Sequence, residues 1–214
     1  MAIKDNVERI KSKLPEDVTL IVAVKYATPA QIEELVKARV RDLGFNEYRQ
    51  LKSVKDLLTG DVRVHFIGHL QRNKVRKVSE YGVYLIQSVD SYRLAERINT
   101  VSGELGIKQD VLLEVKTDEG NENKYGFAPS ELEETALRIE GGLPNLHICG
   151  LMTVPPENLQ EAIKSFALMN RSYVQLSQKL GRDLDYLSMG MSNDYREAVE
   201  QGANMVRIGR MIFE

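Results

Sequence analysis

The sequence predicts an α/β fold, a single (β/α)8 TIM barrel with an extra helix at its amino terminus. Three observations support it: short apolar runs alternate with helical patterns, eight such runs can be counted, and no linker divides them. Runs such as LIVAV and VLLEV are apolar almost throughout, which is typical of parallel strands buried on both faces. An open, doubly wound sheet is the competing architecture. We expect residues 1–214 to form one barrel domain.

The elements follow in order along the chain. The first is an amphipathic helix that ends before Pro15, with apolar positions at Ile3, Val7, Ile10 and Leu14. Strands are expected at residues 20–24, 41–45, 62–67, 84–89, 111–115, 146–152, 184–188 and 205–208. The helices between them are expected to begin near Pro29, Glu47, Gln71, Ser91, Pro129, Glu157 and Ser192. Asp194 and Glu197 have capping-box spacing, which moves the last of these starts slightly later.

Composition excludes several classes of protein. With 43% hydrophobic and 28% charged residues, the chain can bury a core without disulfides or metals. A net charge of −2 does not favour nucleic acid or acidic membranes as partners. The single cysteine, Cys149, allows no internal disulfide and suits a reducing compartment. The amino terminus is not a signal peptide, and no apolar run has the length of a membrane span. We therefore expect a cytoplasmic protein.

Lys25 follows the first strand directly, and no acidic residue lies within several positions of it. In α/β barrels the active site forms at the carboxyl ends of the strands. A lysine that loses hydration there favours its neutral form, and a neutral amine forms a Schiff base with aldehydes and ketones. The simpler interpretation is a solvated lysine at the end of a strand.

The segments after the last two strands combine hydroxyls, glycines and an arginine. LSMGMSND contains Ser188, Gly190 and Ser192, and VRIGR contains Arg207 and Gly209. Backbone N–H groups, hydroxyls and a guanidinium together can hold a phosphate, which barrels often bind after strands 7 and 8. The alternative is that both glycines only allow strand-to-helix turns.

A phosphate site beside a lysine of this kind indicates a phosphorylated carbonyl compound as the ligand. Pyridoxal phosphate, held by the lysine as an internal aldimine, is one candidate. A sugar phosphate bound by an aldolase-type lyase is the other.

These residues lie in segments that resemble the pyridoxal-phosphate homeostasis proteins, a family similar to the N-terminal barrel of alanine racemase. The resemblance covers nearly the whole chain. The matching segments, in the family's order, are VAVKYATP (22–29), HFIGHLQRNKVRKV (65–78), QSVDS (87–91), NKYGF (123–127), GLMTVPP (150–156), LSMGMSNDYREAVEQGA (187–203) and MVRIGRMIFE (205–214).

The resemblance implies a barrel with pyridoxal phosphate at its mouth and Lys25 as the Schiff-base lysine. It also implies that Ser188, Gly190, Ser192, Arg207 and Gly209 lie around the phosphate. In the related racemases an arginine faces the pyridine nitrogen, and Arg207 could take that role instead of contacting phosphate. Such an arginine disfavours protonation of the ring nitrogen and weakens the ring as an electron sink.

The sequence departs from the family's pattern in two places. In LGFNEYRQ (43–50), Phe45 stands where the family has a glutamate, and Glu47 follows Asn46. Asn46 keeps its place, and with His69 at the end of the third strand it completes the expected cofactor-binding set. The second departure is Val24, where the family has a small polar residue before the lysine, so the register at Lys25 is open by one residue.

Two functions compete within this resemblance. The first is cofactor binding and homeostasis without strong catalysis, in which the partner is pyridoxal phosphate and apo-enzymes could receive it. The second is a pyridoxal-phosphate enzyme such as an amino-acid racemase, which needs acid–base groups on both faces of the substrate. We favour the first, because the tyrosine of alanine racemases comes from an additional domain for which the chain leaves no room after its last strand. A monomer is expected.

The histidines and the cysteine have simpler interpretations. His65 lies within the third strand, so a packed or hydrogen-bonded role in the core is favoured over catalysis. His147 and Cys149 alternate in the sixth strand and lack metal-ligand spacing with other residues, so core packing is favoured there as well. We expect no metal site and assign no catalytic residue.

Overall fold

The computed structural model describes residues 2–118, 120–121 and 124–214, and its eight strands form a closed parallel barrel in the order β1 to β8. The strands are β1 (Thr19–Ala23), β2 (Asp42–Phe45), β3 (Arg63–Phe66), β4 (Leu85–Val89), β5 (Gln109–Glu114), β6 (Leu146–Met152), β7 (Tyr186–Ser188) and β8 (Met205–Ile208). The predicted barrel is therefore confirmed, and the open sheet is excluded.

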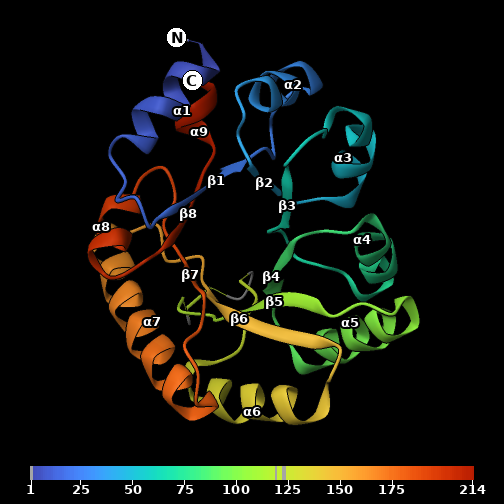
Figure 1. Cartoon of the computed structure of the whole chain (residues 1–214). Helices are drawn as coiled ribbons and strands as arrows, with labels where there is room; N and C mark the ends of the chain where they lie inside the picture. The colour runs from blue at the N-terminus through green and yellow to red at the C-terminus, as the bar shows by residue number, and fades with distance from the viewer. Residues whose placement is uncertain (1, 119, 122–123) are drawn as a thin grey trace.

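Helices surround this barrel on its outside (Figure 1). They are α1 (Ile3–Lys11), α2 (Pro29–Lys37), α3 (Tyr48–Ser53), α4 (Val75–Tyr81), α5 (Tyr92–Leu105), α6 (Leu132–Gly142), α7 (Leu159–Leu180), α8 (Tyr195–Glu200) and α9 (Arg210–Phe213), with 3-10 turns η1 (Lys55–Leu57), η2 (Arg72–Lys74) and η3 (Pro129–Glu131). Helix α2 begins where expected, because Thr28 and Gln31 form a capping box ahead of Pro29. None of the helices in the described ranges has the length and apolar character of a membrane span.

The end of the chain differs most from the prediction. Helix α8 begins at Tyr195, later than Ser192, and the capping-box spacing of Asp194 and Glu197 had indicated such a later start. The capping box itself does not form. The Asp194 carboxylate instead accepts a hydrogen bond from the Met191 N–H, at 2.6 Å, and so stabilises the turn before the helix. Helix α9 was not predicted, because four residues are too few to show a helical period.

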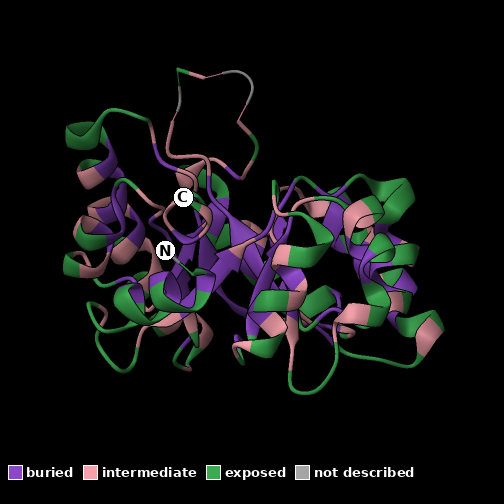
Figure 2. Ribbon diagram, turned by 90° about the horizontal axis from the view of Figure 1, so that it is seen from above, coloured by how far each residue is buried: buried purple, intermediate pink, exposed green. Residues whose placement is uncertain are grey.

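Side chains alternate between the two sides of the barrel wall. A small cluster fills the interior, made of Ile21, Leu85, Leu112, Cys149, Met152 and Met205. A much larger cluster fills the layer between the strands and the helices, and Figure 2 shows this buried centre enclosed by exposed helix surfaces. Two packed layers around a closed sheet explain why the strands are apolar on both faces.

The barrel closes between its first and last strands. Thr19 lies opposite Met205, and Ile21 lies opposite Arg207, in a parallel register of β1 with β8. Outside this seam α1 lies beside α9 (Figure 1), and the Asn6 side-chain amide donates a hydrogen bond to the Ile212 carbonyl at 3.0 Å. Closure brings the segment after β1 next to the segment after β8, which in turn adjoins the segment after β7.

Candidate functional site

Polar side chains gather at the carboxyl ends of the strands, which together form the mouth of the barrel. They follow consecutive strands around the barrel, and the pairing of β1 with β8 brings the two ends of the series together. The set comprises Lys25, Asn46, His69, Asp90, Glu114, Thr153, Ser188, Ser192, Asp194 and Arg207. The predicted site residues therefore share one end of the molecule.

Lys25 lies in the turn that follows β1. Val24 still belongs to the parallel ladder, since its N–H donates to the Gly44 carbonyl at 3.0 Å. Ile21, four residues earlier in β1, faces the barrel interior, so the turn that holds Lys25 begins at the mouth. The side chain is exposed, with Nζ 5.0 Å from the centre of the Tyr26 ring. The dry environment expected for this lysine is therefore not supplied by the protein alone, which corrects that expectation.

None of the ion pairs among the described residues includes Lys25. The Tyr26 ring face offers a weak cation–π contact instead of a carboxylate. An exposed amine without a counter-charge is free to meet a ligand that enters the mouth.

The segment after β7 makes a tight turn that suits an anion. Gly190 has a φ of +91°, and a Cβ there would lie 2.6 Å from the Cβ of Ala198. Its carbonyl accepts a hydrogen bond from the Arg207 N–H, at 3.0 Å, so the turn is joined to β8. Ser192, two residues later, is half-buried, and neither its N–H nor its hydroxyl has a partner in the described part of the chain. Two donors are therefore available at the turn.

Replacing Gly190 with alanine should lower the free energy of unfolding by about 2 kcal/mol. An L-residue is strained at this φ, and the added methyl group overlaps α8. Gly141→Ala in α6 is the matched control, because a Cβ at Gly141 meets no atom within 4 Å. Urea unfolding of both variants tests this, and equal stability of the two would contradict the strained turn.

Arg207 is buried at the carboxyl end of β8 and is held at two points. Its Nη1 donates to the Ser188 hydroxyl, and its Nη2 donates to the Thr153 carbonyl, each at 2.7 Å. Burial lowers the pKa of Arg207 to about 10, against the pull of the Glu114 and Asp194 carboxylates. The guanidinium is therefore charged at neutral pH, with an orientation fixed by β7 and by the segment after β6.

Ser188 lies inside the barrel, below the mouth. Its hydroxyl donates to the Gln87 side-chain oxygen at 2.8 Å and accepts from Arg207. The Gln87 amide nitrogen lies 3.1 Å from Nδ1 of His65, whose Nε2 lies 2.9 Å from an Asp42 oxygen. We call these five residues, Asp42, His65, Gln87, Ser188 and Arg207, the interior network.

The hydrogen bonds of the interior network are consistent with a single assignment of donors and acceptors. The Gln87 amide donates to Nδ1 of His65, so the ring proton is on Nε2 and is donated to Asp42. Burial lowers the pKa of His65, which favours this neutral ring. The predicted hydrogen-bonded core role of His65 is confirmed. Its partners were not predicted, because they come from separate strands.

Glu114 is a member of the mouth that the sequence analysis missed. It ends β5, is buried, and its side chain has no hydrogen bond within the described residues. Burial, with a contribution from Asp90, raises the pKa of Glu114 to about 7, while Arg207 and Lys124 act in the opposite direction. The sequence did contain a signal for Glu114, namely an acidic residue within the otherwise apolar run VLLEV. That run was interpreted only as a buried strand.

The ionisation of Glu114 should make the protein less stable as the pH rises. The unfolded chain releases this proton near pH 4.5 and the folded chain near pH 7, so between these values the folded state binds one proton more. The free energy of unfolding then falls through this window, by at most about 3 kcal/mol.

Glu114→Gln should remove this loss, so that the ligand-free variant is more stable than the parent by about 2 kcal/mol at pH 8 and similar to it near pH 4.5. Urea unfolding at several pH values measures the difference. Glu131→Gln, at an exposed position in η3, is the control and should keep the parent's pH dependence. Parallel profiles for the Glu114 variant and the parent would contradict this assignment.

Asn46 and His69 lie on the neighbouring sector of the rim, after β2 and β3. A Cβ at Gly68 would lie 2.2 Å from the Asn46 carbonyl oxygen, so the two segments approach closely only because residue 68 is glycine. His69 stacks on Tyr125 with ring centres 3.8 Å apart, and its Nδ1 lies 2.9 Å from an Asp90 oxygen. Glu47 is exposed, and its side chain makes no capping bond to α3.

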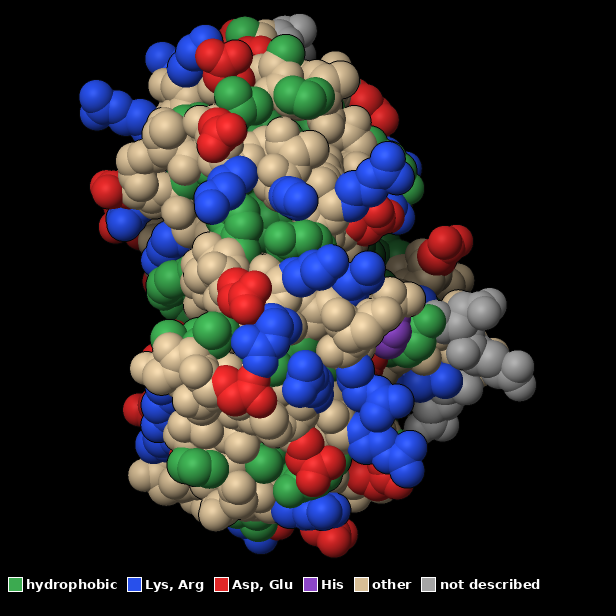
Figure 3. Space-filling view, turned by 90° about the vertical axis from the view of Figure 1, so that its right-hand side faces the viewer, with side chains coloured by type: hydrophobic (Ala, Val, Ile, Leu, Met, Phe, Trp, Pro, Cys, Tyr) green, Lys and Arg blue, Asp and Glu red, His purple; other side chains and the backbone are tan. Residues whose placement is uncertain are grey.

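Two cavities open beside this rim sector. One, of about 340 Å³, is lined by residues that include Asn46, Glu47, His69 and Lys74. The other, of about 480 Å³, is lined by Gln71, Arg72, Asn73, Arg93 and Arg97. Figure 3 shows Lys and Arg side chains gathered on this side of the molecule. The rim therefore offers positive charge to an approaching anion.

Comparison with known proteins agrees with this geometry. The family model described as the alanine racemase N-terminal domain matches residues 1–214. The chain is 36% identical to the pyridoxal phosphate homeostasis protein of Synechocystis over 208 residues, which cover 95% of this chain and 94% of that protein. It is 33% identical to the human protein of that description, covering 99% of this chain and 83% of the human one.

Solved structures of similar proteins have the same fold as this chain. PipY of Synechococcus elongatus, solved without pyridoxal phosphate, superposes with a TM-score of 0.92 at 34% identity, covering 99% of this chain and 100% of PipY. The form with pyridoxal phosphate bound gives 0.90, with the same coverage. Alanine racemase of Clostridium difficile, at 18% identity and a TM-score of 0.78, shares the fold over 56% of its own length.

Proposed function

The chain belongs to the alanine racemase N-terminal domain family and, within it, to the pyridoxal phosphate homeostasis proteins, and from this we propose that it binds pyridoxal phosphate at the barrel mouth and serves cofactor homeostasis. The observation that carries the proposal is the pairing of a buried, charged Arg207 with the Gly190 turn at the ends of adjacent strands. The donor-rich turn suits the phosphate of such a ligand, and the cation beside it suits the unprotonated nitrogen of the pyridine ring.

The residues present fit this cofactor. The free N–H and hydroxyl of Ser192 at the Gly190 turn suit a phosphate. Gly209 lets the adjacent segment pack closely against Ala23 of β1, and we assign its backbone to the same phosphate. Arg207 is tied to Ser188 and to the Thr153 carbonyl, so we assign it to the pyridine ring and assign the phosphate to the two turns. An arginine beside the ring nitrogen disfavours its protonation.

Lys25 is the residue that we propose holds the cofactor covalently. Bound pyridoxal phosphate supplies an aldehyde, whose carbon forms a double bond to an uncharged amine while the carbonyl oxygen leaves as water. The Lys25 amine is exposed and has no acidic partner within the described residues, so it can reach a ligand in the mouth. Asn46 and His69 are proposed to line the other side of the cofactor.

Binding without strong catalysis is the form of the proposal that we favour. Racemisation needs an acid–base group opposite the lysine. Among the tyrosines near the mouth, Tyr48 packs on the core, Tyr125 stacks on His69, and Tyr26 adjoins Lys25 itself. We further propose that the protein acts as a cytoplasmic monomer whose cofactor can pass to apo-enzymes.

A visible spectrum before and after borohydride tests the proposal. The purified protein, loaded with pyridoxal phosphate, should show a yellow absorption band that borohydride bleaches, with the cofactor mass fixed on Lys25. Assays for racemase and lyase activity on the loaded protein should give no substantial turnover. A protein that stays colourless and takes up no cofactor would overturn the binding proposal. A substantial racemase rate would support the enzyme alternative.

A further inference from the structure

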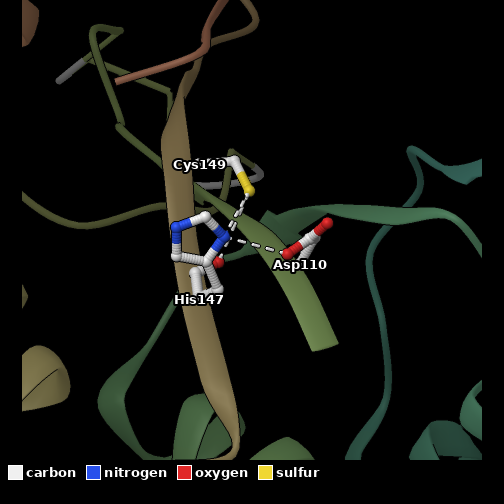
Figure 4. A group of neighbouring side chains, drawn as sticks. All are labelled: Asp110, His147 and Cys149. Carbon is white, nitrogen blue, oxygen red and sulfur yellow. Dashed lines mark hydrogen bonds and ion pairs between the residues drawn. The ribbon is translucent and has the colours of Figure 1, made fainter. Parts of the chain in front are cut away.

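Three potential metal ligands meet at the end of the barrel opposite the mouth (Figure 4). Asp110 near the start of β5 lies opposite His147 near the start of β6, and Cys149 follows two residues later on the same side of β6. Their ligand atoms all lie within 4.8 Å of one another. The sequence showed only His147 and Cys149 together, because Asp110 joins them through the pairing of β5 with β6.

The side chains of Asp110 and Cys149 both approach the same atom, Nδ1 of His147. An Asp110 oxygen lies 3.0 Å from it, and the Cys149 sulfur lies 3.3 Å from it on another side. Nε2 of the same ring has no partner within the described residues. A catalytic Cys–His–Asp relay would use the two ring nitrogens separately, one for the cysteine and one for the aspartate. The carboxylate oxygen, the ring nitrogen and the sulfur therefore lie side by side, as the ligand atoms of a single cation do.

We propose that Asp110, His147 and Cys149 bind a divalent transition-metal ion of the Zn²⁺ class, with water as the fourth ligand. Imidazole, carboxylate and thiolate are the ligands that zinc takes in tetrahedral sites. Binding would displace the thiol proton to solvent, so affinity should rise with pH. The side chains of Asp110 and His147 are 43% and 36% exposed, which leaves an entry path and room for water.

The surroundings of the three-residue cluster add negative charge, and the paired strands hold its side chains in place. The Asp185 N–H donates to the Cys149 carbonyl at 2.8 Å, which brings a second acidic residue next to the cluster. Asp110 and His147 are paired along the β5–β6 ladder, so the backbone that carries the ligands is already in place. Because the cluster is at the amino ends of these strands, it is separate from the site proposed for pyridoxal phosphate.

Cobalt is the probe that tests this site, because a thiolate bound to Co²⁺ gives an intense charge-transfer absorption. Cys149 is the only cysteine of the chain, so such a band can come from no other residue. Untagged full-length protein, with and without pyridoxal phosphate, should develop the band up to one equivalent of Co²⁺ and lose it when Zn²⁺ is added. Competition with a chromophoric chelator then gives the zinc affinity.

Variants separate this site from binding elsewhere. His147→Gln and Asp110→Asn should each weaken zinc binding by at least about 100-fold, and Cys149→Ser should abolish the band. Asp185→Asn is the matched control, and it should keep the zinc affinity and the cobalt band within a few-fold of the parent. Circular dichroism confirms that each variant is folded. No sulfur–cobalt band in the parent, or unchanged affinity in His147→Gln and Asp110→Asn, would overturn the proposal without bearing on the cofactor site.

Discussion

Lys25→Ala is expected to abolish covalent attachment of pyridoxal phosphate to the protein. The mouth would lose the exposed, unpaired amine that follows β1, while the Gly190 turn, Ser192 and Arg207 would be unchanged. The variant should therefore keep reversible binding through its phosphate contacts but lose the borohydride-reducible band. Mass spectrometry of the reduced, denatured protein measures the attached cofactor directly.

Lys116→Ala is the matched control for this experiment. Lys116 also follows a strand at the mouth, directly after Val115, and is half-buried. Its replacement should leave attachment at the level of the parent. If Lys25→Ala retained a reducible band, or if the cofactor mass moved to Lys116, then Lys25 would not be the attachment residue.

Arg207→Gln is expected to lower the free energy of unfolding by about 3–5 kcal/mol, the scale for breaking a buried set of charges. The variant leaves the buried carboxylates of Glu114 and Asp194 without their cation. It also weakens the donors to the Ser188 hydroxyl and the Thr153 carbonyl. Urea unfolding gives the change, and Arg210→Gln, exposed on α9, serves as the control.

The loss should be larger at pH 8 than at pH 5. Arg207 lowers the pKa of Glu114, so removal of the arginine disfavours the ionised carboxylate that prevails at high pH. Adding Glu114→Gln to the Arg207 variant should recover part of the stability, and the double-mutant cycle gives the coupling between the two. A loss that does not depend on pH would show that Arg207 acts through packing and hydrogen bonds rather than charge.

Local sequence pattern predicted the strands and a closed barrel, but not the register in which the barrel closes. Apolar runs located all eight strands to within a few residues, because both faces of a barrel strand are buried. Short elements were less visible: β7 begins at Tyr186, later than expected, and α9 has too few residues to show a period. The pairing of β1 with β8 depends on residues at opposite ends of the chain, which no local pattern contains.

The candidate site was likewise predictable in its members but not in the bonds between them. Lys25, Gly190 and Arg207 could be placed at one mouth, because the carboxyl ends of parallel strands meet there. The bonds between site residues could not be predicted. The Ser188 hydroxyl turns into the barrel toward Gln87, and Glu114 gains its raised pKa from a burial that only the folded structure supplies.

The seam between β1 and β8 has a consequence for how the protein is made. Thr19 finds its partner Met205 only after almost the whole chain has left the ribosome. Until then the growing sheet has two open edges, and open edges of apolar strands can pair with other chains. Contacts between such distant residues also slow folding. The barrel should therefore close late in biosynthesis, and truncated chains that lack β8 should aggregate rather than bind a ligand.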